Sequence, residues 1–219
     1  MTNAGDLWAA GRIVAAEGLV NAFGHISVRT DADSLMITPP VALGSLTSSS
    51  PCDRVSLAAT DLPTGTPKEA WIHVAIYRAR PDVHAICRAQ PEYATALASA
   101  GVPIQPLHGQ GSFLGDQVPV FADSRLVRNL SRAEQLATTL GEADGLVMRG
   151  NGAVTVGASL AEAVGRMWVL EKSARMNAIA ASAGTPTALS TDQQDAWRTT
   201  SSELLHRIWT YLSTLHTLT

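Results

Sequence analysis

The chain has 219 residues, 46% of them hydrophobic and 16% charged, and its 16 Lys and Arg against 19 Asp and Glu give a formal charge of -3. This apolar fraction is large enough to bury a core, which excludes a disordered polypeptide. The slightly acidic balance, without any run of basic residues, argues against binding to nucleic acid or to an anionic membrane surface. No uncharged apolar stretch of about 18 residues is present, so no membrane span is expected.

The N-terminus and the cysteines indicate the compartment. The chain opens without Lys or Arg and soon carries Asp6 and Glu17, unlike a secretory signal peptide. Cys52 and Cys87 are too few for a disulfide scaffold or a thiolate metal site. At about 150 residues per domain, the length favours one large domain. We therefore expect a soluble, cytoplasmic protein with a single domain over residues 1–219.

Hydrophobic periodicity predicts one helix and then short strands in the first part of the chain. Apolar residues at mixed spacings of three and four predict a helix over 4–18, ended by a glycine. Residues 26–29 alternate between apolar and polar, which is the period of a half-buried strand. The strands expected here cover 24–30, 35–38 and 54–58, with a polar turn over 31–34 and a loop over 39–51.

A helix over 66–80 follows. Thr66 suits the N-cap, Pro67 suits the first helical position, and Glu69 in the first turn faces the positive end of the helix dipole. Pro81 ends the helix because it cannot continue helical geometry.

The remaining two-thirds of the chain mix short strands with helices. A Gly-Asn-Gly turn predicts a hairpin of two strands, 145–149 and 153–156. Other strands are expected over 84–89 and 118–121, helices over 91–101, 131–141, 160–183 and 192–215, and a loop over most of 103–119. Short strands interspersed with helices on one core predict an α/β fold, a three-layer domain.

Ordered motifs along nearly the whole chain resemble one family. They read GL-x3-FGHISVR, ITP, E-x3-H-x2-IY, RPDVHAI, P-x-YATALA, FLG-x3-PVF and RGNG-x4-G. This order resembles the class II aldolase/adducin family, and GHISVR and RGNG are closest to its decarboxylase-like branch. The resemblance implies an α/β/α sandwich around a mainly antiparallel, mixed sheet. It also implies small-molecule substrates and a homo-oligomer, usually a tetramer.

Members of this family bind a divalent metal through three histidines, and the resemblance places those positions at Arg88, Gln90 and Asn151. A guanidinium has no lone pair for a cation. Two positive charges about 4 Å apart cost about 4 kcal/mol at an effective dielectric of about 20. The two amide oxygens beside an Arg make a poor site. We therefore expect neither a metal nor another cofactor at this position.

Phosphate recognition also differs from that of the sugar-phosphate members of the family. The resemblance places Pro40-Val41 where those members have a Thr-Gly, and Pro67-Lys68 where they have two serines. Proline has no N–H to donate to an anion. Lys68, near a helix N-terminus, can still attract a carboxylate or phosphate. The expected ligand is a small anionic or carbonyl compound other than an ordinary sugar phosphate.

Several groups remain as candidates for chemistry. Glu69 occupies the position of the family's acid/base glutamate, although it can also simply complement the helix dipole. Arg88 can hold a carboxylate or enolate oxygen, with Gln90 and Asn151 as neutral donors, or it can pair with Glu69 in a decayed site.

Two histidines, His25 and His108, are candidates for an acid, a base or a carboxylate-binding donor. Each can instead be a hydrogen-bonded structural residue, or the two can join His73 in a displaced metal site.

Two classes of function follow from these residues. The first is a metal-independent carbon–carbon lyase, decarboxylase-like or retro-aldol, that acts through an enolate; isomerisation or cyclisation can use the same enolate. The second is a non-catalytic member that keeps the fold for binding or assembly, as adducin does. All three residues at the ligand positions are polar and able to hydrogen-bond, which favours a repurposed pocket.

Overall fold

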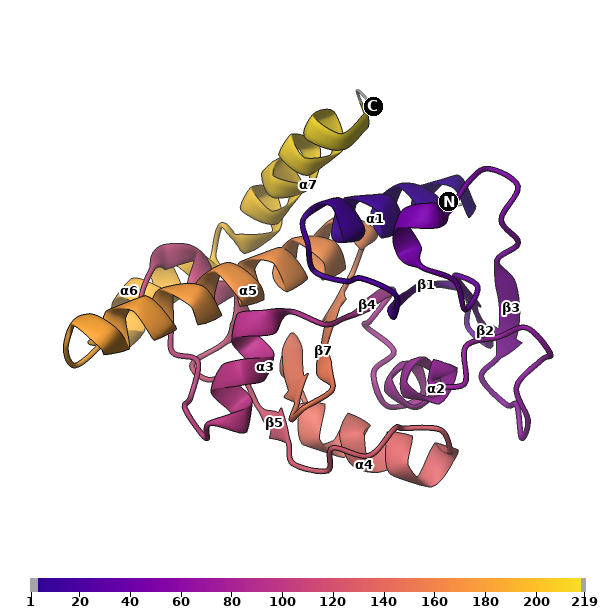
Figure 1. The fold of residues 1–219 in the computed structure, drawn as a ribbon, viewed down its shortest axis with the longest axis horizontal. Coiled ribbons are helices and arrows are strands. Elements are labelled where there is room, and N and C mark those ends of the chain that lie inside the picture. Colours follow the sequence, from indigo (N-terminus) through magenta and orange to yellow (C-terminus); the bar gives the residue numbers. More distant parts are fainter. Residues whose placement is uncertain (1–3, 218–219) are drawn as a thin grey trace.

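The computed structural model describes residues 4–217 and has a seven-stranded sheet at its centre (Figure 1). Every neighbouring pair in the sheet is antiparallel except β5 and β6, which are parallel. This confirms the predicted mainly antiparallel, mixed sheet. In spatial order the strands are β3 (Asp53–Ser56), β2 (Ser34–Ile37), β1 (His25–Asp31), β4 (Ala85–Ala89), β7 (Gly152–Gly157), β6 (Gly145–Met148) and β5 (Val120–Phe121).

Helices cover both faces of the sheet, which confirms the predicted three-layer arrangement (Figure 1). One apolar core lies between the sheet and α1 (Ala4–Ala16), α3 (Glu92–Ser99), α5 (Leu160–Ala183) and α7 (Ser201–Thr217). The second core lies between the sheet and α2 (Ala70–Ala79) and α4 (Leu130–Leu140). None of the helices in the described part of the chain is long and apolar enough to cross a membrane.

The alternation in β1 decides which side chains reach the candidate site. Ile26 and Val28 belong to the α1/α5 core. Their neighbours His25 and Ser27 therefore point to the other face, where α2 covers them and buries them. The strand is thus buried on both faces at this end, with polar side chains under α2.

The helix predicted over 66–80 begins later than expected. Its first helical residue is Ala70, and Glu69 takes the N-cap position without a side-chain hydrogen bond to the helix. Thr66 does not act as the cap; its Oγ1 is buried without a hydrogen-bond partner among the described residues. The expectation of a Thr66 cap was wrong because Glu69 is drawn into contacts with other segments, described below.

The last predicted helix, 192–215, is two helices, α6 (Thr191–Arg198) and α7. At the break, the hydroxyls of Thr199 and Thr200 donate to the carbonyls of Ala196 and Trp197. These carbonyls would otherwise accept bonds from the next helical turn. The loop predicted before residue 119 also contains a short 3-10 helix, η2 (Gly109–Leu114), and the loop over 39–51 contains η1 (Leu43–Ser45).

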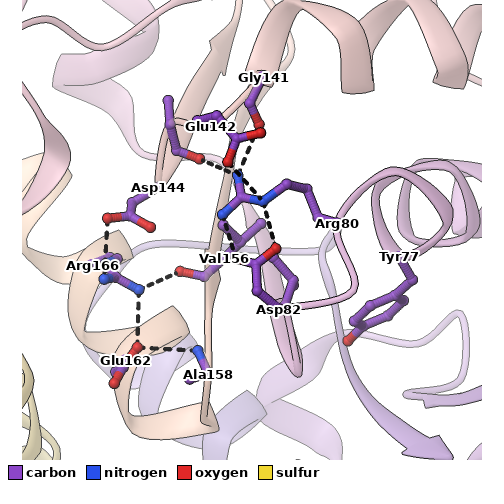
Figure 2. A network of polar contacts seen from close by, with 12 residues as sticks. Tyr77, Arg80, Asp82, Gly141, Glu142, Asp144, Val156, Ala158, Glu162 and Arg166 are labelled. Carbon is purple, nitrogen blue, oxygen red and sulfur yellow. Dashed lines mark hydrogen bonds and ion pairs between the residues drawn. The ribbon is translucent and has the colours of Figure 1, made fainter. Parts of the chain in front are cut away.

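Two buried arginines tie α2 and α5 to the segment before β6 and to β7 (Figure 2). Arg80, at the end of α2, forms a bidentate pair with Asp82 at 2.7 and 2.8 Å and donates to the Gly141 carbonyl at 2.8 Å. Arg166 on α5 donates to the Val156 carbonyl at 2.9 Å and pairs with two carboxylates, those of Asp144 and Glu162.

The turn between β6 and β7 depends on a glycine. Gly152 has a φ of 98°, and a Cβ there would lie 2.2 Å from the Ala89 carbonyl oxygen. Gly152→Ala should lower the free energy of unfolding by about 1–3 kcal/mol, measured by urea denaturation. Gly184→Ala is the control, because an added Cβ there meets no atom within 4 Å. Equal stabilities of the two variants would contradict this account of the turn.

Candidate functional site

A cavity of about 260 Å³ opens beside the start of β1, on the α2 side of the sheet. Its volume suits a small molecule. Five parts of the chain form its walls: the segment that leads into β1, the loop after β2, the segment before α2, strand β4, and the loop after β5. The lining residues are Ala22, Phe23, Gly24, His25, Pro40, Val41, Pro67, Lys68, Glu69, Arg88 and Arg128.

Arg88 forms the floor of this cavity and is only 1% exposed. It lies on β4, directly opposite His25 of β1 in the strand register. Its Nη2 donates to the backbone and side-chain oxygens of Asn151 at 3.0 and 2.9 Å, and lies 3.1 Å from Oε2 of Glu69. The sequence left open whether Arg88 serves a ligand or pairs with Glu69, and the structure shows the pairing.

The guanidinium retains capacity for another partner. Its Nε is buried without a hydrogen-bond partner among the described residues. Burial lowers the pKa of Arg88, and the neighbouring Glu69 charge opposes that effect. Because Arg stays protonated in proteins, the cavity floor carries a fixed positive charge. An anionic ligand in the cavity would offset part of the desolvation of this charge.

Glu69 is held by segments far away in the sequence. Its Oε1 accepts from the backbone N–H of Val127 at 3.1 Å and from Nδ2 of Asn151 at 3.3 Å. With Oε2 beside Arg88, both carboxylate oxygens have partners outside α2. The carboxylate therefore belongs to the cavity, and capping α2 is not its role. A carboxylate in this position can exchange a proton with a ligand above Arg88.

His25 is the second titratable group at the cavity wall. Its Nδ1 lies 2.7 Å from Nε2 of His73, which is fully buried on α2. Burial, then the neighbouring His73 and Arg88, lower the pKa of His25 well below its ordinary value. Burial, reinforced by Arg88, lowers the pKa of His73 to about 3. Both imidazoles are therefore neutral at pH 7, which suits a hydrogen-bond acceptor or base better than a cation.

Two further cations lie at the rim. Lys68 and Arg128 are exposed, line the cavity and have no side-chain partner among the described residues. Lys68 was expected from the sequence to attract an anion, and the structure places it at the cavity. Arg128 was missed because it lies in an irregular loop without any motif.

The remaining predicted site residues lie apart. Gln90 faces a separate hollow between α3 and the β6–β7 turn, and it does not line the cavity of Arg88. His108 precedes η2 and is hydrogen-bonded through Nε2 to Ser173 Oγ on α5 at 2.9 Å; burial lowers its pKa. The structure therefore brings Glu69, Arg88, His25 and Lys68 together at the cavity, but not Gln90 or His108. Asn151 is hydrogen-bonded to Arg88 and Glu69 but lines the separate hollow of Gln90.

The residues at this position do not suit a divalent metal. Asn151 Oδ1 could coordinate a metal ion, but it already accepts a hydrogen bond from Arg88. The guanidinium nitrogens of Arg88 have no lone pair with which to coordinate a metal. Within the described residues, no group of three or more His, Cys, Asp or Glu side chains is arranged to hold a metal ion. The structure does not bring His25, His73 and His108 together in a displaced metal site. His25 and His73 contact each other, whereas His108 is hydrogen-bonded to Ser173 of α5.

Comparison with known proteins identifies the family. The family model described as Class II Aldolase and Adducin N-terminal domain matches residues 5–178, so the chain belongs to this family. It is 29% identical to a 3,4-dihydroxyphthalate decarboxylase of Rhodococcus jostii over 189 residues, covering 79% of this chain and 78% of that protein. It is 26% identical to a decarboxylase of Talaromyces stipitatus, covering 74% and 70% of the two chains.

Solved structures confirm the fold. An L-fuculose-1-phosphate aldolase of Thermus thermophilus matches with a TM-score of 0.71 at 31% identity, covering 80% of this chain and 92% of that one. An L-fuculose 1-phosphate aldolase of Glaciozyma antarctica matches with a TM-score of 0.81 at 24% identity, covering 97% and 87%. The relatives of this chain are thus lyases, both decarboxylases and aldolases.

The buried neutral histidines predict a pH-dependent stability. Unfolded histidine, with a pKa of about 6.5, binds a proton that folded His73 does not bind until about pH 3. The unfolded state therefore holds more protons below about pH 6.5, and stability falls as the pH decreases. Each such histidine costs up to about 1.4 kcal/mol per pH unit in this window.

Urea unfolding at pH 7 and pH 5 measures this effect. His73→Gln should reduce the loss of stability between the two pH values, because the unfolded state then has one fewer histidine that takes up a proton which the folded state does not bind. His206→Gln, at an exposed position on α7, is the control and should keep the loss seen for the unaltered chain. An unchanged loss in His73→Gln would contradict the assignment.

Proposed function

We propose that this protein is a metal-independent carbon–carbon lyase, decarboxylase-like or retro-aldol, that acts through an enolate on a small oxygenated carboxylate. The observation that carries the proposal is a buried guanidinium on the cavity floor with an unpartnered Nε. The relatives named as decarboxylases support the reaction class. We further propose a cytoplasmic homo-oligomer, preferably a tetramer, without nucleic-acid or membrane partners.

Arg88 stabilises the charge that develops on the substrate, and Asn151 supports Arg88. When a carboxylate leaves as CO2, the electron pair of the broken C–C bond moves toward the adjacent oxygen and makes an enolate. The Arg88 guanidinium is placed to hold that oxygen anion in a buried, weakly screened environment, where a fixed charge acts strongly. Asn151 Oδ1 and the Glu69 carboxylate keep the guanidinium in place.

Glu69 and His25 transfer protons to and from the substrate. In a decarboxylation, the enolate carbon takes up one proton that enters from solvent, and the free lone pair of Glu69 or His25 relays it to that carbon. In a retro-aldol cleavage, His25 first accepts the proton of the substrate hydroxyl, the C–C bond breaks, and the enolate carbon takes that proton back. Gln90 and His108 lie outside this cavity, and the proposal gives them no step.

The rim indicates the substrate class. Lys68 and Arg128 add two exposed cations above Arg88, so a ligand with more than one anionic oxygen suits the cavity. Pro40 and Pro67 line the same wall without an N–H to offer a phosphate. A small aromatic or aliphatic hydroxy-carboxylate is therefore favoured over a sugar phosphate.

The contact between Arg88 and Glu69 at 3.1 Å supports a second candidate, a non-catalytic binding or assembly protein. In that case the pair would be purely structural, since a buried charge needs a counterion whether or not it acts on a ligand. Turnover separates the two candidates.

The first test is release of CO2 or of a carbonyl fragment from a panel of hydroxy-carboxylates. The panel includes 3,4-dihydroxyphthalate, the compound in the name of the Rhodococcus relative. Arg88→Met should lower kcat/KM about 100-fold or more, because the enolate loses its cationic partner. Arg54→Met, on the exposed edge strand β3, is the matched control and should retain activity. Undiminished turnover in Arg88→Met would refute the proposed role.

The second test concerns metal. The purified protein should contain well below one equivalent of Zn, Mn, Fe, Co or Ni per chain, measured by elemental analysis, because Arg88 repels a cation from the position. Treatment with a chelator should leave the activity unchanged. A stoichiometric transition metal, or loss of activity on chelation that added metal restores, would refute metal independence.

A further inference from the structure

A chain of buried polar side chains runs from the cavity into the protein under α2. His25 Nδ1 lies 2.7 Å from His73 Nε2, and His73 Nδ1 lies 2.6 Å from Ser27 Oγ. Ser27 Oγ lies 3.0 Å from the Tyr77 hydroxyl, which donates to the His84 carbonyl at 3.4 Å. Apart from that terminal carbonyl, all members of the chain are buried side chains.

Local geometry brings these residues together. His25 and Ser27 are two apart on β1 and therefore share the face that α2 covers. His73 and Tyr77 are four apart on α2 and therefore lie one above the other on the same side of the helix. Figure 2 shows the Tyr77 side chain apart from the Arg80 network, so its hydroxyl is not engaged there.

The far end of the chain sets the direction of every hydrogen bond in it. A carbonyl only accepts, so the Tyr77 hydroxyl uses its one proton on His84. Ser27 must then donate to Tyr77, which leaves Ser27 only an acceptor for His73. His73 therefore carries its proton on Nδ1, and its bare Nε2 must accept from His25.

Burial and the neighbouring charges favour the same donor and acceptor directions along the chain of hydrogen bonds. Burial raises the pKa of Tyr77, so its hydroxyl keeps the proton that the chain starts from. Burial and neighbouring positive charge keep both imidazoles neutral, so each has one N–H and one lone pair. Arg88 lies opposite His25 in the strand register, and a lone pair is favoured over an N–H beside a guanidinium.

We propose that Ser27, His73 and Tyr77 are positioning residues that hold His25 in the tautomer with its proton on Nδ1. This tautomer leaves the lone pair on Nε2, the ring nitrogen available to the cavity that His25 lines. The chain orients His25 and does not conduct a net proton, because it ends on a carbonyl that takes none away.

The tautomer of His25 is a property of the folded chain and does not depend on turnover. Only the role of its Nε2 lone pair as the base for a substrate hydroxyl rests on the proposed function. As a property of the folded chain, the tautomer can be measured in the absence of any substrate. A failed tautomer assignment and a failed lyase assignment are therefore separate outcomes.

The test is long-range 1H–15N NMR of the full chain labelled with 15N-histidine, at pH 7.5. The signals of His25 are assigned by their loss in His25→Gln. The expected result is a pyrrole-type, protonated Nδ1 and a pyridine-type, unprotonated Nε2. A protonated Nε2 in the unaltered protein overturns the proposal.

Tyr77→Phe tests the cause with little change in volume. Without the Tyr77 oxygen, Ser27 donates to His73 instead, every bond in the chain reverses, and the proton of His25 moves to Nε2. Tyr93→Phe, at a half-exposed position on α3, is the matched control and should leave the His25 signals in place. A folded Tyr77→Phe variant with unchanged His25 signals overturns the proposal.

Ser27→Ala gives a second, independent reading if Tyr77→Phe does not fold. It removes the link between Tyr77 and His73, so only the charge of Arg88 still favours the original order, and the two His25 nitrogens should move toward averaged positions. His25 signals in Ser27→Ala identical to those of the unaltered protein also overturn the proposal, because the hydrogen-bond chain would then contribute nothing. Circular dichroism of each variant establishes that the comparison is made between folded proteins.

Discussion

The guanidinium of Arg88 is buried in the central strand of the sheet, and the desolvation of that charge has to be offset by nearby groups. Removing one partner of a buried ion pair costs about 3–5 kcal/mol, because an uncompensated charge stays behind. Glu69 supplies the counterion and Asn151 two acceptor oxygens. These groups come from the segment before α2 and from the β6–β7 turn, and Val127 of the loop after β5 completes the coordination of Glu69. One charge thus brings three separate segments to one place.

The buried arginines differ in how completely they are satisfied. All three nitrogens of Arg80 bind oxygens of Asp82 or Gly141, as a structural cation requires. Arg88 makes its hydrogen bonds to the described residues from Nη2, and its Nε has no partner. Neutral histidines surround it on the β1 side, and Lys68 and Arg128 add charge at the rim. The resulting positive potential supports the proposal that the cavity takes an anionic ligand.

Local patterns predicted most of the fold because they are properties of adjacent residues. The Gly-Asn-Gly turn, the alternation along β1 and the long apolar stripe of α5 each depend only on short-range spacing, and each element was found. The break at Thr199 and Thr200 was not predicted, because the periodicity continues through it and the break depends on hydroxyl contacts with the preceding turn. The late start of α2 has a different origin, since partners distant in the sequence hold Glu69.

The candidate site was predictable only in its residue types. Glu69, Arg88, Asn151 and His25 could be selected by their resemblance to family motifs, and the structure joins them. The contact of His25 with His73 spans 48 positions in the sequence, and the role of Ser27 appears only once β1 lies beneath α2. Gln90 is two residues from Arg88 in the sequence, but it lies beyond the end of β4 and lines a different hollow.

A double-mutant cycle on Glu69 and Arg88 tests the central claim most directly. The free energies of unfolding of the unaltered chain, Glu69→Gln, Arg88→Met and the double variant are measured by urea denaturation under one set of conditions. If the buried pair organises the site, the two residues are coupled by about 2 kcal/mol or more, and the double variant recovers part of the stability lost in Glu69→Gln. A coupling below about 0.5 kcal/mol would show that the two substitutions act independently, and would contradict the account.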